Sequence, residues 1–448
     1  MTRKILPFVL ALLLPATLPA QTVRSWTLSD CISYALAHNI QLRKQEAGIQ
    51  SSRADVAESK AAWLPSLSVG VSQALQYRPF QENASSFVNG NLASSAADKA
   101  TQSGNYGINA AWTVWDGGSR QLNISSSELS LRQSELQLTQ QANSIQEELT
   151  TLYVQILYLQ EAVDVNRTLL QQDSIVLERG RQMLQQGQIS KADLAQLESQ
   201  LSSGLYNVVN AETQVANYTL QLKQLLELGP TDEISLAAEP PADASCLTPI
   251  PVKLEVYESA LRQRPEVKSG ELAVEQSKLQ EQIARRGYLP TVNLTGGVGD
   301  SHVTGGNQGY FQQMKQNFNA NVGLSLSIPI LDNRQTKSRI ERAQAAGLTS
   351  QLDLEDTRKQ LYERIETYWL NATNGQAKFR AATANVQALQ TSYDLTQEQF
   401  RLGLKNIVEL LTSRASLLNA RQELLQDKYT TVLNRTLLDF YAGKEIQL

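Results

Sequence analysis

The chain has 448 residues, 42% of them hydrophobic and 19% charged, and its formal net charge of −4 gives no sign of a nucleic-acid partner. It contains two histidines, His38 and His302, and two cysteines, Cys31 and Cys246, which are too few for a typical zinc or iron–sulfur site. The sequence shows no nucleophile elbow and no phosphate-binding loop. We therefore expect no metal, no cofactor and no enzyme activity.

Residues 1–20 are typical of a secretory signal peptide. Arg3 and Lys4 give a positive start, residues 5–14 form an apolar segment too short to span a bilayer, and Leu-Pro-Ala ends at Ala20. No cysteine follows this point directly, so a lipid anchor is not expected there, and no other run of about 20 apolar residues occurs. We expect an exported mature chain with 38 basic and 44 acidic residues, a net charge of −6 and no transmembrane helix.

Export makes a disulfide between Cys31 and Cys246 possible. Such a bond would join the first helix of the mature chain to the central linker. Two separate buried thiols are the alternative, and we favour it.

Prolines divide the rest of the chain. None lies between positions 80 and 229 or after 329, which leaves two long stretches without this helix breaker. The proline cluster that follows Gly229 is typical of a linker. We expect a first structural repeat at 21–228, a linker at 229–252 and a second repeat at 253–448.

The two halves match in sequence. Trp63-Leu64-Pro65 recurs as Tyr288-Leu289-Pro290 at an offset of 225 positions, and Gly187 aligns with Gly403 at an offset of 216. The smaller offset indicates a shorter loop in the second half. A two-fold repeat of this length indicates a duplicated domain rather than a solenoid.

Each half begins with a predicted helix, at 39–63 and 264–288, that ends at a proline. Apolar residues then alternate with polar ones, as at Leu67, Val69 and Val71, and this period of two predicts strands with one apolar and one polar face. Two strands separated by a polar loop are expected in each half, at 65–80, 105–115, 290–299 and 319–331.

Very long helices are predicted after the strands. Apolar residues such as Leu138, Ile145 and Leu152 repeat every seven positions and predict a coiled-coil seam. In both halves 71 residues separate the end of the second strand from a glycine turn, which amounts to roughly 100 Å of helix. The returning helices are shorter, and end-to-end stacking on the helix that precedes the strands makes up the difference.

The two glycine turns carry the same local signal. Gly187 is followed by Ser190 and Asp193, and Gly403 by Asn406 and Glu409. Each set is a C-terminal glycine followed by an N-cap residue with an acid three positions later. We expect a paired helical turn in each half.

Four strands with one apolar face cannot close a barrel, and lipid does not tolerate open sheet edges. Either the sheet packs on a soluble core, or several copies pool their strands. The strand lengths suit a tilted membrane strand. Aromatic residues near the strands suit either a membrane girdle or an ordinary core. The Gln-rich and Ser-rich helix faces suit either a solvated tunnel wall or the outside of any coiled coil.

This ordered set resembles the TolC-like outer-membrane efflux protein family over essentially the whole mature chain. The resemblance depends on the signal peptide, the duplicated unit and the tip sequences at 183–194 and 400–411. It implies a mixed α/β membrane protein in the bacterial outer membrane. In such a protein a homotrimer pools four strands per protomer into a twelve-stranded β-barrel, which is continuous with a long α-helical coiled-coil tunnel in the periplasm.

The resemblance also implies that the hairpin tips form the periplasmic entrance and contact a periplasmic adaptor, or membrane fusion, protein. Residues matching the family's tips are the candidates for this contact: Gly187, Ser190, Arg401, Leu402, Gly403 and Asn406. The second tip matches the family motif well. The first tip lacks the arginine, so equal contact at both tips is in doubt.

Three residues near the tips are candidates for the entrance gate. Asp193 and Glu409 lie where family members place an acidic ring, although both acids could simply complete capping boxes, and the two roles are compatible. Lys405 either pairs with an acidic neighbour in the closed state or is solvated.

The expected function is that of a passive duct in contact with outer-membrane lipid. It conducts substrates from an inner-membrane transporter, through the adaptor, to the outside of the cell. The alternative is an exported coiled-coil scaffold or adhesin without a pore. That alternative explains the heptads but not the paired strands at matching positions in both halves.

Overall fold

The computed structural model describes residues 25–447 with the exception of 81–82, 89–90, 97–98, 238–240 and 305–307. The expected signal peptide at 1–20 lies outside the described residues. The chain forms two compact units, and each contains segments from both sequence repeats. Unit 1 is Met1–Ile40, Ala142–Tyr257 and Ile365–Leu448, and unit 2 is Gln41–Gln141 and Glu258–Arg364. Among the described helices, none is both long enough and apolar enough to cross a membrane.

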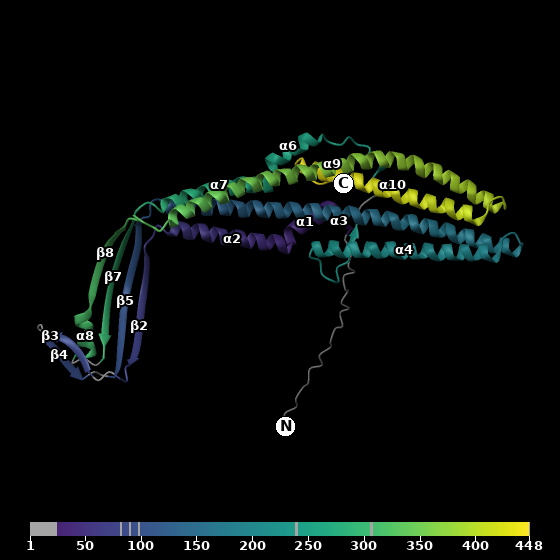
Figure 1. The fold of residues 1–448 in the computed structure, drawn as a ribbon. Coiled ribbons are helices and arrows are strands. Elements are labelled where there is room, and N and C mark those ends of the chain that lie inside the picture. Colours follow the sequence, from purple (N-terminus) through teal and green to yellow (C-terminus); the bar gives the residue numbers. More distant parts are fainter. Residues whose placement is uncertain are drawn as a thin grey trace, which may run out of the picture. The chain divides into compact units, whose positions relative to one another are not determined.

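Unit 2 contains a four-stranded antiparallel sheet (Figure 1). Its strands are β2 (Ser66–Tyr77), β5 (Ala100–Trp115), β7 (Thr291–Val303) and β8 (Asn319–Ser327), in the order β2-β5-β7-β8. The central pair joins the two sequence repeats, with Ile108 opposite Val298. This arrangement leaves β2 and β8 as the two edges of the sheet.

The sheet has the two faces that the alternation predicts. On the apolar face Leu67 and Val69 are each 73% exposed, and Val322 is 84% exposed. An apolar surface of this extent marks a region that is covered in the functional state. The opposite face carries small and amide side chains such as those of Asn109 and Asn321.

The loops between the paired strands are more structured than the sequence predicts. The first contains the hairpin β3 (Asn83–Val88) and β4 (Asn91–Ala96), and the second contains the helix α8 (Tyr310–Asn317). The strand expected at 319–331 ends at Ser327, because Pro329 has no N–H to give to a ladder.

Four long helices and two medium ones precede or follow the sheet. The outgoing helices α3 (Ser119–Gln185) and α9 (Gln335–Arg401) have 67 residues each, and the returning helices α4 (Lys191–Leu225) and α10 (Ile407–Tyr441) have 35 each. Before the strands come α2 (Ile40–Ala61) and α7 (Pro265–Arg286). At ~1.5 Å per residue the 67-residue helices extend roughly 100 Å, in agreement with the sequence.

Within unit 1 the end of α4 meets the region between α1 (Leu28–His38) and α2. The side-chain amide of Asn39 donates to the Leu225 carbonyl at 3.2 Å, and the Ile40 N–H donates to the Glu227 carboxylate at 3.2 Å. This is the end-to-end contact of two short helices that the sequence predicts. The coiled-coil seam that the sequence predicts is also present within α3 of this unit, because Leu149 and Ile156 are fully buried there.

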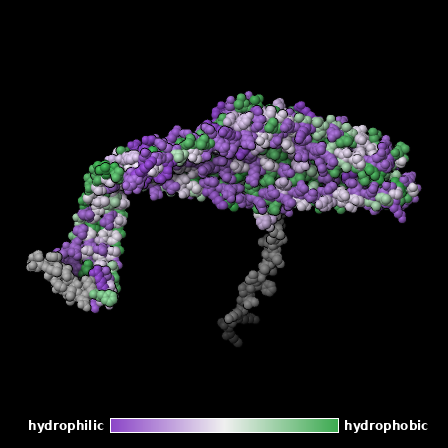
Figure 2. All heavy atoms as spheres, in the orientation of Figure 1, coloured by the Kyte–Doolittle hydropathy of each residue, from purple (hydrophilic) through white to green (hydrophobic). Residues whose placement is uncertain are grey.

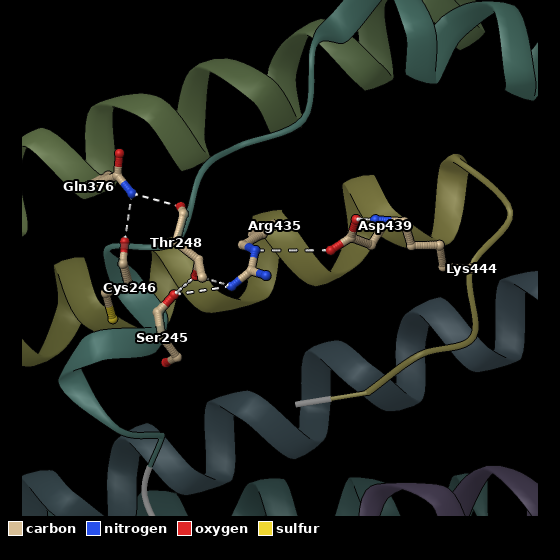
Figure 3. Close-up of polar contacts among 7 residues, drawn as sticks. All are labelled: Ser245, Cys246, Thr248, Gln376, Arg435, Asp439 and Lys444. Carbon is tan, nitrogen blue, oxygen red and sulfur yellow. Dashed lines mark hydrogen bonds and ion pairs between the residues drawn. The ribbon is translucent and has the colours of Figure 1, made fainter.

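Within the linker between the repeats, β6 (Ser235–Leu236) forms a parallel bridge with β1 (Ser25–Trp26), and the short helix α5 (Asp243–Cys246) follows. The helix α6 (Lys253–Gln263) begins directly after the linker. Side chains of α9 and α10 hold the linker in place (Figure 3). The Gln376 amide donates to the carbonyls of Cys246 and Thr248 at 2.8 and 3.0 Å, and Arg435 donates to the Ser245 carbonyl at 3.1 Å.

Both cysteines are free and buried, which agrees with the favoured alternative of two separate thiols. Burial, reinforced by the Asp30 carboxylate, raises the pKa of the Cys31 thiol to about 12. Burial also raises the pKa of Cys246. Each sulfur is therefore an unreactive, protonated core group.

Candidate functional site

The first hairpin turns between α3 and α4 at Gly187. This glycine has a φ of +72°, a left-handed conformation that side chains disfavour. The N–H of Gln188 donates to the Met183 carbonyl at 2.9 Å, and that of Gly187 to the Leu184 carbonyl at 3.0 Å. These bonds satisfy carbonyls that the helix end would otherwise leave unpaired.

The following helix begins with a capping box. The Ser190 hydroxyl accepts from the Asp193 N–H at 3.1 Å, and the Asp193 carboxylate accepts from the Ser190 N–H at 2.9 Å. Both bonds lower the pKa of the Asp193 carboxyl, with the backbone bond having the larger effect. Among the described residues Asp193 makes no salt bridge, so its negative charge is not compensated at the tip.

The second hairpin repeats this geometry at Gly403, which has a φ of +70°. The Leu404 N–H donates to the Gln399 carbonyl at 2.9 Å. Asn406 caps α10 by accepting from the Glu409 N–H at 2.9 Å, and its own N–H donates to the Glu409 carboxylate at 3.4 Å. The predicted paired turns are therefore both present, and both acids complete capping boxes.

The second tip differs from the first in its charges. The Lys405 ammonium lies 3.0 Å from a Glu409 carboxylate oxygen, in a pair whose side chains are 40% and 42% exposed. This hydrogen bond, followed by that from the Asn406 backbone, lowers the pKa of Glu409. Arg401 pairs with Glu398 on the preceding turn, and both side chains are about half exposed.

The tips also differ in their exposed surfaces. At the second tip Leu402, Leu404 and Val408 are 58%, 72% and 59% exposed, whereas Gln186 and Gln188 occupy the exposed positions of the first. Green hydrophobic patches interrupt the mainly hydrophilic surface of the helices in Figure 2. We call Leu402, Leu404 and Val408 the tip patch.

Beneath the tips, the four long helices share one apolar core in unit 1. It contains nine buried residues, and each helix contributes: Val176, Leu177, Met183, Leu197, Tyr393, Phe400, Ile407, Leu410 and Leu417. The two hairpins of a protomer therefore form a single packed body near their turns.

A buried ion pair lies in this core. Arg414 of α10 donates to both carboxylate oxygens of Asp173 of α3, at 2.6 and 2.5 Å, and the two side chains are only 7% and 4% exposed. The Gln200 amide of α4 lies 3.4 Å from the same carboxylate. Gly204, also on α4, leaves room for the pair, because a Cβ there would lie 3.1 Å from the Asp173 carboxylate.

Sequence reasoning missed this ion pair and two residues of the tip patch, Leu404 and Val408. The partners Asp173 and Arg414 are 241 positions apart, so no local motif links them. The available signals were a glycine inside a long helix and charged residues beside an apolar seam.

The sequence matches the profile of the family described as outer membrane efflux protein over residues 31–227 and 256–444. The chain belongs to this family. A curated relative, the outer membrane protein TolC of Escherichia coli K12, is 24% identical over an alignment of 452 positions that covers 97% of this chain and 85% of TolC. The outer membrane efflux protein BepC of Brucella suis biovar 1 is 21% identical, with coverages of 94% and 87%.

Solved structures show the same fold. The CmeC outer membrane channel of Campylobacter jejuni superposes with a TM-score of 0.75 at 17% identity, covering 94% of this chain and 87% of CmeC. As an outer membrane efflux protein, the chain is an outer-membrane channel with the fold of the trimeric TolC-like channels, in which a β-barrel continues into a helical tunnel. The predicted fold, function and location are confirmed. The family consists of channels, which are not enzymes, and TolC-like channels work with adaptors and inner-membrane pumps.

Proposed function

We propose that three copies of this chain form the outer-membrane duct of a tripartite efflux or secretion system, with the hairpin tips as its periplasmic entrance. The observation that carries the proposal is a sheet with two open edges, β2 and β8, and an uncovered apolar face. Lipid can cover the apolar face but cannot satisfy the backbone groups of the edges. Pairing of β8 with β2 of the next copy satisfies them and closes a twelve-stranded barrel.

The adaptor contact lies at the tips and is unequal between them. At the second tip Arg401, Leu402, Gly403 and Asn406 lie beside exposed apolar side chains, which suit packing against a helical partner. At the first tip Gly187 and Ser190 lie among glutamines and offer polar contacts alone. The adaptor in turn connects the duct to an inner-membrane transporter, which supplies the energy.

The gate consists of Asp193, Lys405 and Glu409. Two carboxylates and one ammonium leave one net negative charge per protomer among these three residues. Three such charges around a narrow closed mouth repel one another and attract cations. The closed entrance is therefore cation-selective, and it opens when the tip helices splay apart.

The test is the mass of the full mature protein after extraction in detergent, together with its conductance in planar bilayers. A mass of three chains and ion conduction are expected. An exported coiled-coil scaffold or adhesin instead leaves membranes in salt or alkali without detergent and conducts no ions. That outcome, or a folded monomer in detergent, rejects the duct.

A further inference from the structure

The strand β7 extends beyond its partner β8. Pairing between them ends where Gly299 meets Asn319, whereas β7 continues to Val303. Backbone groups on this last part of the β7 edge need other partners, because an open edge is a site of unwanted pairing. The helix α8 lies beside this end of the sheet (Figure 1) and contacts β7.

Side-chain amides of α8 take the place of a strand along this edge. Gln313 accepts from the Val303 N–H at 2.8 Å and donates to the Val303 carbonyl at 2.9 Å. Asn317 donates to the Ser301 carbonyl at 2.6 Å. These three bonds pair the Val303 N–H and the carbonyls of Val303 and Ser301, while the Ser301 N–H donates to the Asp300 carboxylate at 2.7 Å, and they hold α8 against the β7 edge.

An aromatic stack fixes the start of the same helix. The His302 ring, only 6% exposed, lies parallel to Tyr106 with 5.8 Å between centroids and edge-on to Tyr310 at 4.8 Å. Gly104 opposes His302 across the β5–β7 ladder, and a Cβ there would lie 2.3 Å from His302 Cε1. Only a glycine therefore allows the imidazole to lie against β5 and Tyr310 to close over it.

The other side of α8 is exposed in the part of the chain that the structure describes. At about 100° per residue, Tyr310, Gln313 and Asn317 share the side that meets β7. Phe311 and Lys315 project away from that side, and Phe311 is 86% exposed. A helix that is held firmly on one side thus presents a large aromatic ring on the other.

We propose that α8 is a wedge between protomers. It fills the outer end of the seam between β8 of one protomer and β2 of the next, with Phe311 packed near Leu75 and Tyr77 of the neighbouring copy. The inference rests on the trimeric barrel of the proposed function and identifies a part of its interface.

Strand lengths support this position. β2 has 12 residues and β8 has nine, and both have one end where the chain enters the helices. If those ends are level, about three residues of β2, or ~10 Å, have no strand opposite them. The eight residues of α8 span ~12 Å, which matches the gap.

The side chains of the gap favour a second copy over lipid as the occupant. Leu75 and Tyr77 are 78% and 67% exposed and lie on the same sheet face as Tyr106 and His302. The unpaired backbone of the β2 end needs hydrogen-bond partners that hydrocarbon cannot supply. Lys315 lies on the free side of α8 with Phe311, so this side of the helix offers a hydrogen-bond donor beside the aromatic ring.

The test is chemical cross-linking of the full mature protein in detergent. Phe311→Cys is combined with Leu75→Cys or Tyr77→Cys, and a short bismaleimide is added. Covalent dimers and trimers are expected on denaturing gels. The matched control pairs Phe311→Cys with Leu67→Cys, which lies on the same face eight residues closer to the helices, ~26 Å away. Variants that carry only one of the added cysteines report any cross-linking through the native thiols of Cys31 and Cys246.

The native mass before cross-linking separates the two proposals. A trimer that cross-links through position 75 or 77 and not through position 67 supports the wedge. A trimer that shows no cross-link, or an equal one at position 67, overturns the wedge and leaves the duct intact. A monomer rejects the trimeric duct itself, and the wedge with it.

Discussion

Loss of one partner of the Asp173–Arg414 pair should destabilise the hairpin body strongly. In Asp173→Asn the Arg414 guanidinium stays buried with no counter-charge, at a side-chain exposure of 7%. Removal of one member of such a pair typically costs about 3–5 kcal/mol, because the remaining charge is left desolvated. Arg414→Gln should cost a similar amount by leaving the carboxylate unpaired.

Replacement of both partners should behave differently. In Asp173→Leu/Arg414→Met two apolar side chains fill a site surrounded by Val176, Leu197 and Tyr393. Apolar replacement of a buried pair is commonly neutral or stabilising by about 1–4 kcal/mol. In the cycle completed by Asp173→Leu alone and Arg414→Met alone, the double variant should therefore be much more stable than the sum of the two single effects predicts.

The assay is denaturant or thermal unfolding of the trimer followed by helical circular dichroism. The matched control is an exposed bridge from the same helix α3 to α4, Arg167 with Glu212, and Glu212→Gln should cost only about 0–1 kcal/mol. If Asp173→Asn unfolds no more easily than Glu212→Gln, the pair does not join the hairpins and the reasoning is wrong.

Four further outcomes follow from the tips and the core. Lys405→Met should raise the cation selectivity of the closed channel and Glu409→Gln should lower it, as measured by reversal potentials across a salt gradient; equal selectivity in both would contradict the gate. Because hydrogen bonds hold the pKa values of Asp193 and Glu409 below their ordinary values of 3.8 and 4.5, the capping boxes are complete above those values. Their stabilisation and the cation selectivity should be lost as the pH falls below about 4, and loss already near neutral pH would refute this. A Cβ added at Gly48, in α2, would have no neighbour within 4 Å, so Gly48→Ala should raise the free energy of unfolding by about 1 kcal/mol through helix propensity. Gly204→Ala should bring no such increase, because its Cβ crowds the ion pair. Leu404→Ser with Val408→Ser should weaken binding of the adaptor at unchanged conductance, and intact binding would exclude the tip patch.

The features that the sequence predicts are those encoded within a few neighbouring residues. Strand faces follow from a period of two, and the tip turns follow from a glycine and a capping box within seven positions. Both are local requirements of the backbone, so Gly187 and Gly403 adopt the predicted conformation. The long helices α3 and α9 follow because no proline interrupts their sequences.

The features that the sequence does not predict depend on contacts across the fold. The strands β3 and β4 consist largely of small polar residues and lack apolar alternation, while α8 is too short for a helical period to emerge. The Asp173–Arg414 pair joins helices from different repeats, and a single sequence does not reveal which charges meet. The α8 amides replace a strand only because β8 starts late.

Duplication explains why the two tips share a backbone and differ in surface. Each capping box fixes how its returning helix begins, so both copies retain an oxygen-bearing cap and an acid three residues later. The exposed positions have no such requirement, and one tip carries an uncompensated acid while the other carries a paired acid and an apolar patch. The shared core and the Asp173–Arg414 pair connect these two tips within a protomer. If an adaptor binds the apolar tip, as we propose, the force that it applies should therefore reach the acidic tip through packed side chains, and one contact should move both parts of the proposed entrance.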